Sequence, residues 1–130
     1  MNEIKELRDK VKDLKVLFVE DEKRIREGTG LFLRKFFNNV IICNDGEEGL
    51  EMFSKVGDFD IIITDILMPK MNGAEMAKKI KEKNKDIFIV FITASRSLVH
   101  DEEELGDMFL KKPISFDDIV MTMKKVVNIK

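Results

Sequence analysis

Five short apolar runs, rich in β-branched residues, alternate along this chain with segments of helical periodicity. The runs are solidly apolar and do not alternate with polar residues, which is typical of strands covered on both faces. Repeated strand-helix alternation with right-handed crossovers predicts a parallel sheet between layers of helices, an α/β doubly wound architecture. The predicted strands are 15–20, 39–43, 59–64, 87–92 and 107–110.

Helices are predicted between the strands from apolar residues that recur along one face. They span 22–37, 46–56 and 72–83, and a last helix follows Ser115. Asp45, Asn72 and Ser115 are suitable N-caps, because their side chains can accept hydrogen bonds from the free N–H groups of a first turn. The residues predicted to face inward are Ile25, Phe32, Phe36, Leu50, Phe53, Met76, Ala77, Ile80, Ile119, Val120, Met123 and Val127.

Residues 2–14 lie outside this alternation and form a separate amphipathic segment. Ile4, Leu7, Val11 and Leu14 recur at three- and four-residue steps among charged residues, which predicts an N-terminal helix or linker before a domain at 15–130. This helix could pack on its own domain, pair with a second copy as a short coiled coil to form a homodimer, or continue a signalling helix of a larger protein.

Composition sets the class of protein. The chain has 130 residues, 44% hydrophobic and 37% charged, which is typical of one soluble globular domain. A net charge of -2 provides no field to hold a nucleic-acid backbone, so no direct DNA binding is expected. The apolar runs are shorter than the roughly 18 residues that a membrane span needs, so a cytoplasmic location without membrane contact is expected. The single cysteine, Cys43, lies in an apolar run and is predicted to be a buried structural thiol.

Polar residues follow four of the predicted strands. Glu20 and Asp21 follow the first, Asp65 the third, Thr93 the fourth and Lys112 the fifth. Because the carboxyl ends of parallel strands share one edge of a sheet, we expect these side chains to converge. Three carboxylates in one place repel one another, by about 4 kcal/mol for a pair at 4 Å and an effective dielectric of 20, so the cluster needs a cation or unusual protonation.

The chain resembles the receiver domain of two-component response regulators, of the chemotaxis-regulator type, over residues 15–129. The resemblance implies a flavodoxin-like fold with strand order 2-1-3-4-5. It also implies that Asp65 is the phosphoacceptor, that Thr93 and Phe109 form a switch, and that Lys112 pairs with the phosphoryl group across a cis Lys112-Pro113 peptide. The matching segments are Leu17-Phe18-Val19-Glu20-Asp21-Glu22, Asn44-Asp45-Gly46-Glu47-Glu48-Gly49-Leu50, Asp60-Ile61-Ile62-Ile63-Thr64-Asp65-Ile66-Leu67-Met68-Pro69-Lys70-Met71-Asn72-Gly73, Ile92-Thr93-Ala94 and Lys111-Lys112-Pro113-Ile114.

The implied cofactor is Mg²⁺, held by Glu20, Asp21, Asp65 and the backbone carbonyl of Leu67. Mg²⁺ prefers carboxylates, waters and phosphate oxygens, so this ligand set suits it. A carboxylate that attacks phosphorus forms an aspartyl phosphate, with no general base required. The expected partners are a sensor histidine kinase or phosphotransfer protein and a downstream protein target. No enzymatic activity is expected beyond phosphorylation and dephosphorylation of the domain itself.

Two departures from the family pattern affect the expected output. The stretch between Thr93 and Lys112 is shorter than is usual, which predicts a short or irregular fourth receiver helix. Phe109 stands where a tyrosine is more familiar, so burial can still be switched but an outward hydrogen bond cannot. Because the sequence ends at Lys130, after the last predicted helix, we expect action through protein contacts. The alternatives are the receiver of a larger hybrid kinase or multidomain regulator, and a phosphorylation-independent interaction module.

Enzymes with a similar sheet fit the sequence less well. A flavodoxin needs a phosphate-binding loop after the first strand, where Glu20, Asp21 and Glu22 would repel phosphate. A dinucleotide-binding fold needs Gly-x-Gly-x-x-Gly at that position, and the chain has none. A haloacid-dehalogenase-like phosphatase needs a second aspartate two residues after the nucleophile, where Leu67 stands.

Overall fold

The computed structural model describes residues 2–94 and 104–129. The strands are β1 Lys15–Val19, β2 Asn39–Cys43, β3 Ile61–Asp65, β4 Phe88–Thr93 and β5 Met108–Lys111. The helices are α1 Asn2–Val11, α2 Lys23–Leu33, α3 Gly46–Val56, α4 Gly73–Lys83 and α6 Phe116–Ile129. In this part of the chain, no helix combines the length and apolar character needed to cross a bilayer.

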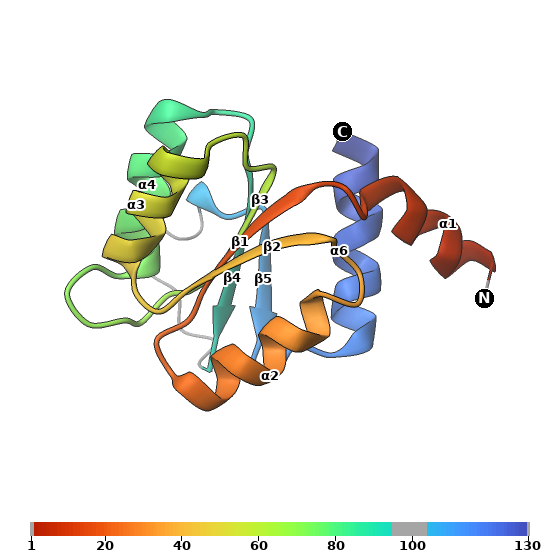
Figure 1. Ribbon diagram of the computed structural model, residues 1–130, viewed down its shortest axis with the longest axis horizontal. Coiled ribbons are helices and arrows are strands. Elements are labelled where there is room, and N and C mark those ends of the chain that lie inside the picture. Colours follow the sequence, from red (N-terminus) through yellow and green to blue (C-terminus); the bar gives the residue numbers. More distant parts are fainter. Residues whose placement is uncertain (1, 95–103, 130) are drawn as a thin grey trace.

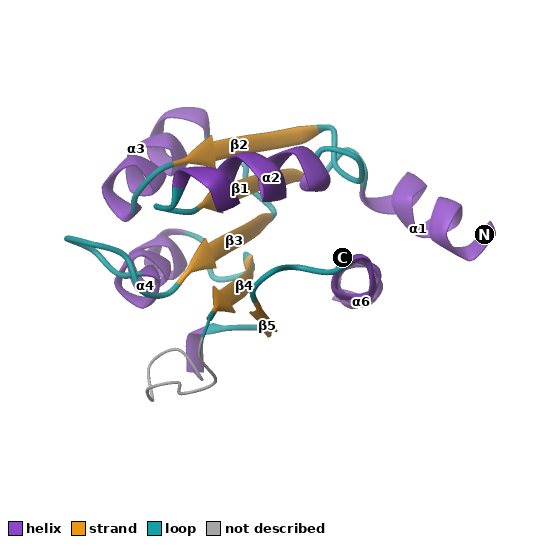
Figure 2. Ribbon diagram, turned by 90° about the horizontal axis from the view of Figure 1, so that it is seen from below, coloured by secondary structure: helices purple, strands orange, loops and turns teal. Residues whose placement is uncertain are grey.

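All five strands form one parallel sheet in the order β2-β1-β3-β4-β5, which confirms the predicted topology. Helices cover both faces of this sheet: α3 and α4 lie together on one face, and α2 and α6 lie on the other (Figures 1 and 2). The predicted third strand 59–64 is shifted to Ile61–Asp65, because Asp65 pairs in register with Ile92 of β4. The predicted phosphoacceptor is therefore the last residue of a central strand.

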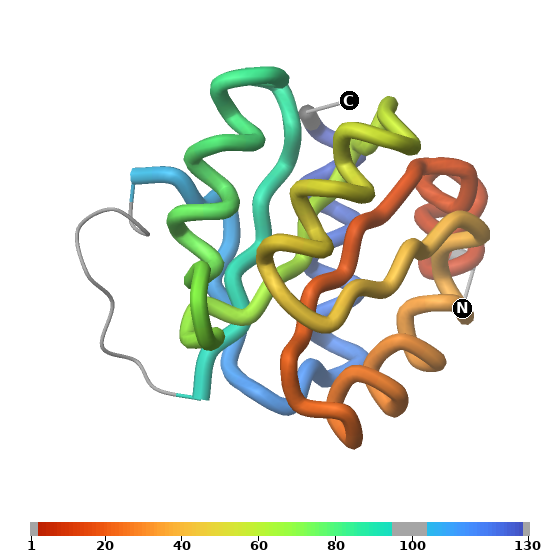
Figure 3. Tube along the Cα trace, turned by 60° about the vertical axis from the view of Figure 1, so that its left-hand side comes forward, coloured from red at the N-terminus to blue at the C-terminus, as the bar shows by residue number. Residues whose placement is uncertain are grey.

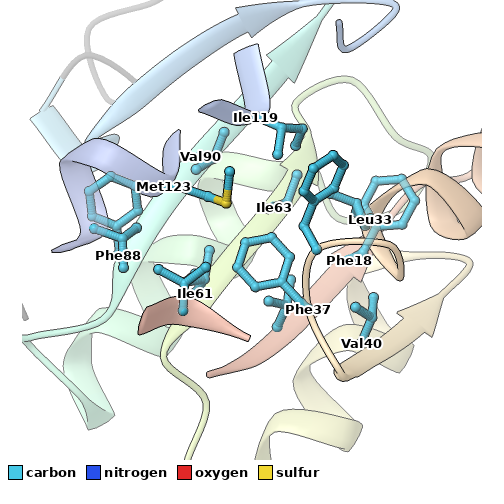
Figure 4. Close-up of a cluster of buried hydrophobic side chains, with 14 of the residues drawn as sticks. Phe18, Leu33, Phe37, Val40, Ile61, Ile63, Phe88, Val90, Ile119 and Met123 are labelled. Carbon is cyan, nitrogen blue, oxygen red and sulfur yellow. The ribbon is translucent and has the colours of Figure 1, made fainter. Parts of the chain in front are cut away.

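Successive residues of β1, β2, β3 and β4 face two separate apolar cores. The edge strand β5 departs from the expectation of strands covered on both faces, because only alternate residues of it are buried. Val16 and Phe18 of β1 face α2 and α6, whereas Leu17 and Val19 face α3 and α4. Both sets are fully buried, which is why the sequence of the strand is continuously apolar. Figure 4 shows part of the core beneath α2 and α6, with Phe18, Leu33, Phe37, Val40, Ile61, Ile63, Phe88, Val90, Ile119 and Met123 labelled.

Helix starts were predicted well from their caps. Asp45 accepts from Glu48 N at 2.8 Å, and Asn72 forms a capping box with Glu75. Ser115 and Asp118 exchange reciprocal hydrogen bonds of the same kind before α6. These contacts satisfy N–H groups that would otherwise lack partners at the start of a helix.

The helix predicted over residues 22–37 ends earlier than expected. Helix α2 ends at Leu33 and not at residue 37, because Phe36 N and Phe37 N both donate to the carbonyl of Leu33, at 3.0 Å each. This turn directs the Phe37 side chain into the core, where it is completely buried. Burial of a large aromatic side chain outweighs the loss of one helical turn.

Helix α1 packs on its own domain, the first of the three alternatives for residues 2–14. Val11 is buried in the core beneath α2 and α6, and Leu7 and Leu14 pack against the same core. Asn38 N donates to the carbonyl of Lys12 at 2.7 Å, and Figure 3 shows this red segment beside the start of β2. A homodimer through residues 2–14 stays a prediction, and it would have to use the part of α1 that this packing leaves exposed.

Two further predictions concern single segments. Cys43 is buried, as predicted, and burial raises the pKa of its thiol to about 12. The short fourth receiver helix was predicted within residues 95–106, and most of that segment lies outside the described residues.

Candidate functional site

The three predicted carboxylates meet at the carboxyl ends of β1 and β3. Glu20, Asp21 and Asp65 each offer an oxygen, and these oxygens all lie within 4.8 Å of one another. Glu20 and Asp65 are buried, whereas Asp21 is exposed. The sheet positions them, because Glu20 N donates to the carbonyl of Cys43 on β2 at 3.1 Å and Asp65 continues the ladder with β4.

Lys112 reaches two of these carboxylates. Its ammonium lies 2.7 Å from Asp65 Oδ2 and 2.9 Å from Glu20 Oε1, and its side chain is 14% exposed. The backbone N–H of Lys112 donates to the carbonyl of Thr93 at 3.0 Å, which ties the residue after β5 to the end of β4. The Lys112-Pro113 peptide is cis, as the family resemblance implied. Sequence reasoning assigned Lys112 to the phosphoryl group and missed its ion pair with Glu20.

The electrostatics of the site follow from burial and from this ammonium. Burial raises the pKa of Asp65, against the hydrogen bond and charge of Lys112, which lower it. Burial also raises the pKa of Glu20, opposed by its hydrogen bond from Glu22 N and by Lys112. For Lys112, burial alone would lower the pKa, but the two carboxylates reverse the effect and the pKa is raised. The site therefore favours proton or cation binding by the acids.

Glu20 supplies an observation that fits a metal ion. Its Oε2 accepts from Glu22 N at 3.0 Å, but Oε1 is the buried side-chain oxygen that accepts no hydrogen bond in the described part of the chain. The contact of Oε1 with Lys112 is close in distance, and its angles fall outside hydrogen-bond geometry. A buried carboxylate oxygen with spare acceptor capacity, beside two other carboxylates, suits a hard cation or a water bound to it.

Arg26 supports the acidic loop and was not found from the sequence. Its guanidinium donates to the carbonyls of Glu20 and Asp21, at 3.0 and 3.2 Å. These bonds hold the backbone that carries both acids and do not occupy the carboxylate oxygens. The only signal in the sequence was a basic residue about one helical turn after the acidic pair, which is too common to single out.

The loop after Asp65 is held close to the site by Gly73. A Cβ atom on Gly73 would overlap the carbonyl oxygen of Asp65, and Gly73 N donates to Ile66 O at 2.7 Å. The start of α4 can therefore approach the end of β3 only with glycine at this position. Leu67, whose carbonyl is the fourth predicted metal ligand, lies within this loop with its side chain exposed.

The two predicted switch residues lie on β4 and β5. Thr93 is buried at the end of β4, at the same edge of the sheet as Asp65. Phe109 on β5 is 38% exposed, and its ring stacks on that of Phe91, with 5.8 Å between ring centroids. Sequence reasoning named Phe109 but missed Phe91, which could have been found by aligning the ends of the last two strands.

Comparison with known proteins places this chain in one family. A family model described as the response regulator receiver domain matches residues 16–124. A cyclic di-GMP phosphodiesterase of Thermotoga maritima is 35% identical over 105 residues, covering 78% of this chain and 28% of that protein. The chain also spans only about half the length of several transcriptional regulatory proteins that it matches.

Two of the solved structures that are similar to this chain overlap with most of it. The response regulator TrrA from Thermotoga maritima, in complex with Mg²⁺-BeF, has a TM-score of 0.77 and 31% identity, covering 87% of this chain and 98% of that one. The receiver domain of Ssk1 from Saccharomyces cerevisiae was crystallised with the histidine phosphotransfer protein Ypd1. It has a TM-score of 0.76 and 24% identity, covers 88% of this chain and 89% of that one, and shows the shared fold.

Proposed function

This chain belongs to the response regulator receiver family, and from that premise we propose that Asp65 accepts the phosphoryl group of a phosphorylation-dependent signalling domain. The observation that carries the proposal is the contact of Asp65 with Lys112, at 2.7 Å, in a site where Glu20 and Asp21 also offer oxygens. One carboxylate thus has both a cationic neighbour and a group of acids suited to a metal ion. That combination supports phosphoryl transfer.

In the proposed reaction, an Asp65 carboxylate oxygen attacks phosphorus, the new P–O bond forms, and the bond from phosphorus to the donor breaks. Lys112, already 2.7 Å from Asp65, neutralises negative charge on the transferred group. Glu20, Asp21, Asp65 and the Leu67 carbonyl would hold Mg²⁺, which supplies charge neutralisation and orientation of the phosphoryl oxygens. Arg26 keeps the acidic loop in place through the backbone.

The proposed output is a change at Thr93 and Phe109. A phosphoryl group adds about -1.5 to -2 units of charge and three acceptor oxygens at the edge of the sheet. The Thr93 hydroxyl can donate to one of these oxygens, and its movement leaves space for Phe109 to rotate inward. Phosphorylation would therefore bias two arrangements of the same residues and not create a new one.

The proposed partners are a sensor histidine kinase or phosphotransfer protein as donor and a protein target downstream. No direct DNA binding by these residues and a cytoplasmic location stay predictions from the sequence. The phosphodiesterase name of one relative is not carried over, because this chain covers 28% of that protein. We propose no catalysis beyond phosphorylation and dephosphorylation of Asp65.

Intact-mass analysis with acetyl phosphate and Mg²⁺ tests the proposal. The wild type should gain one acid-labile phosphoryl group, and Asp65→Asn should gain none while remaining folded. Glu22→Gln is the matched control, because this exposed acid stands next to Asp21 but outside the proposed ligand set. The same adduct on Asp65→Asn would remove Asp65 from the reaction. No adduct on the wild type would favour the phosphorylation-independent interaction module.

A further inference from the structure

Gly106 lies against both rings of the Phe91–Phe109 pair. A Cβ atom at this position would come within 2.7 Å of Phe109 Cζ, 2.9 Å of Phe109 Cε1 and 2.7 Å of Phe91 Cδ2. Carbon atoms in contact prefer separations of about 3.5–4.0 Å, so there is no room for a side chain at residue 106 while both rings keep these positions. The stacked arrangement depends on the missing side chain.

The surroundings of Gly106 have little freedom to adjust. Phe91 is completely buried, and it pairs in register with Phe109 across the β4–β5 ladder. The backbone after Gly106 is fixed to β4, because Asp107 N donates to Ile89 O at 2.7 Å and Ile89 N donates to Asp107 Oδ2 at 2.8 Å. The Phe109 ring is the exposed member of the group, with 38% of the residue accessible. An added methyl group would therefore displace the Phe109 ring most, and its approach to Phe91 Cδ2 would need a smaller shift of the Phe91 ring or of residue 106.

We infer that Gly106 is the positioning residue for the switch aromatic: its missing side chain creates the place in which the Phe109 ring rests on Phe91. This inference rests on the proposed function, because it gives a resting position to the residue proposed to switch. The atoms nearest to a Cβ at residue 106 belong to the Phe109 and Phe91 rings, so Gly106 acts through these rings and not through the proposed phosphoryl or metal site. The residue does not require a left-handed backbone, in contrast to Gly57, whose φ is 71°. Alanine at 106 therefore tests space alone.

The test compares Gly106→Ala with the wild type by NMR, with Phe ring protons assigned. In the wild type, nuclear Overhauser effects should connect the Phe109 ring to the α protons of Gly106 and to the Phe91 ring. In Gly106→Ala, the contact between the two rings should be lost before any phosphoryl mimic is added. The change in Phe109 ring shifts on addition of beryllofluoride with Mg²⁺ should then fall to less than half of the wild-type change. Gly28→Ala is the control, because a Cβ at Gly28 meets nothing within 4 Å.

A double-mutant cycle keeps the test decisive if Gly106→Ala folds poorly. Phe109→Ala removes the ring, so Gly106→Ala should lower the melting temperature less in that background than in the wild type. Equal losses in both backgrounds would overturn the inference. A ring contact and a beryllofluoride response of wild-type size in Gly106→Ala would overturn it as well. Failure of the proposed function is separate, since it would appear as the absence of the Asp65 adduct in the wild type, whatever residue 106 does.

Discussion

Replacing Lys112 with Met should destabilise the metal-free domain by about 3 kcal/mol. Lys112 is the cation that contacts both buried carboxylates, Asp65 and Glu20, whose side chains are 8% and 0% exposed. With oxygens as far apart as 4.8 Å, two such charges repel by about 3.5 kcal/mol at an effective dielectric of 20. Removal of one partner from a buried pair typically costs about 3–5 kcal/mol, and proton uptake by the carboxylates reduces this cost.

Thermal melts in EDTA at neutral pH measure this effect, which corresponds to a fall of roughly 10 °C in a domain of this size. Lys55→Met is the control, because Lys55 makes an ion pair of 3.0 Å with Glu51 in which both side chains are more than half exposed. Its loss should cost less than about 1 kcal/mol. Mg²⁺ should narrow the gap between Lys112→Met and the wild type, because a divalent cation neutralises the unpaired carboxylates. If Lys112→Met has the melting temperature of the wild type in EDTA, the pairing of Lys112 with Asp65 and Glu20 does not stabilise the domain, and the prediction is refuted.

Three other predictions follow from the site and from α1. Burial raises the pKa of Asp65 and Glu20, so the folded metal-free protein binds protons more tightly than the unfolded chain. The unfolding free energy of the wild type, relative to that of Asp65→Asn, should therefore rise as the pH falls from 7 toward 5. Denaturant titrations in EDTA that show the relative unfolding free energy falling over this range would contradict the raised pKa values. Thr93→Ala should accept the phosphoryl group but show a weaker conformational response at Phe109. Changes in the Phe109 NMR shifts on addition of beryllofluoride that equal those of the wild type would refute the coupling between Thr93 and Phe109. Val11→Ala should lower the unfolding free energy by about 2 kcal/mol, because Val11 is 1% exposed in the core. A melting temperature equal to that of the wild type would show that α1 does not stabilise the domain and would favour its interpretation as a linker.

Local patterns in the sequence predicted most of the fold. Apolar runs located all five strands to within two residues at each end, because most strand residues face one of the two apolar cores. Strand β5 differs on one face, where Phe109 and Lys111 are exposed. Caps located helix starts, since the hydrogen bond from Glu48 N to Asp45 spans only three residues. The convergence of Glu20, Asp21 and Asp65 was also predictable, because parallel topology brings the carboxyl ends of neighbouring strands together.

Contacts between distant segments were decided only by the tertiary structure. The sequence contains Lys112, but its ion pair with Glu20 depends on how the chain after β5 returns toward β1, more than 90 residues away in sequence. The same holds for Val11, since an apolar stripe is compatible with a coiled coil or with the domain's own core, and only the assembled surface beneath α6 selects the second. Gly106 carries no pattern of its own, and its role becomes visible when two aromatic rings occupy the space beside it. Hydrophobic periodicity determines which residues are buried, whereas the packed backbone determines which of them touch.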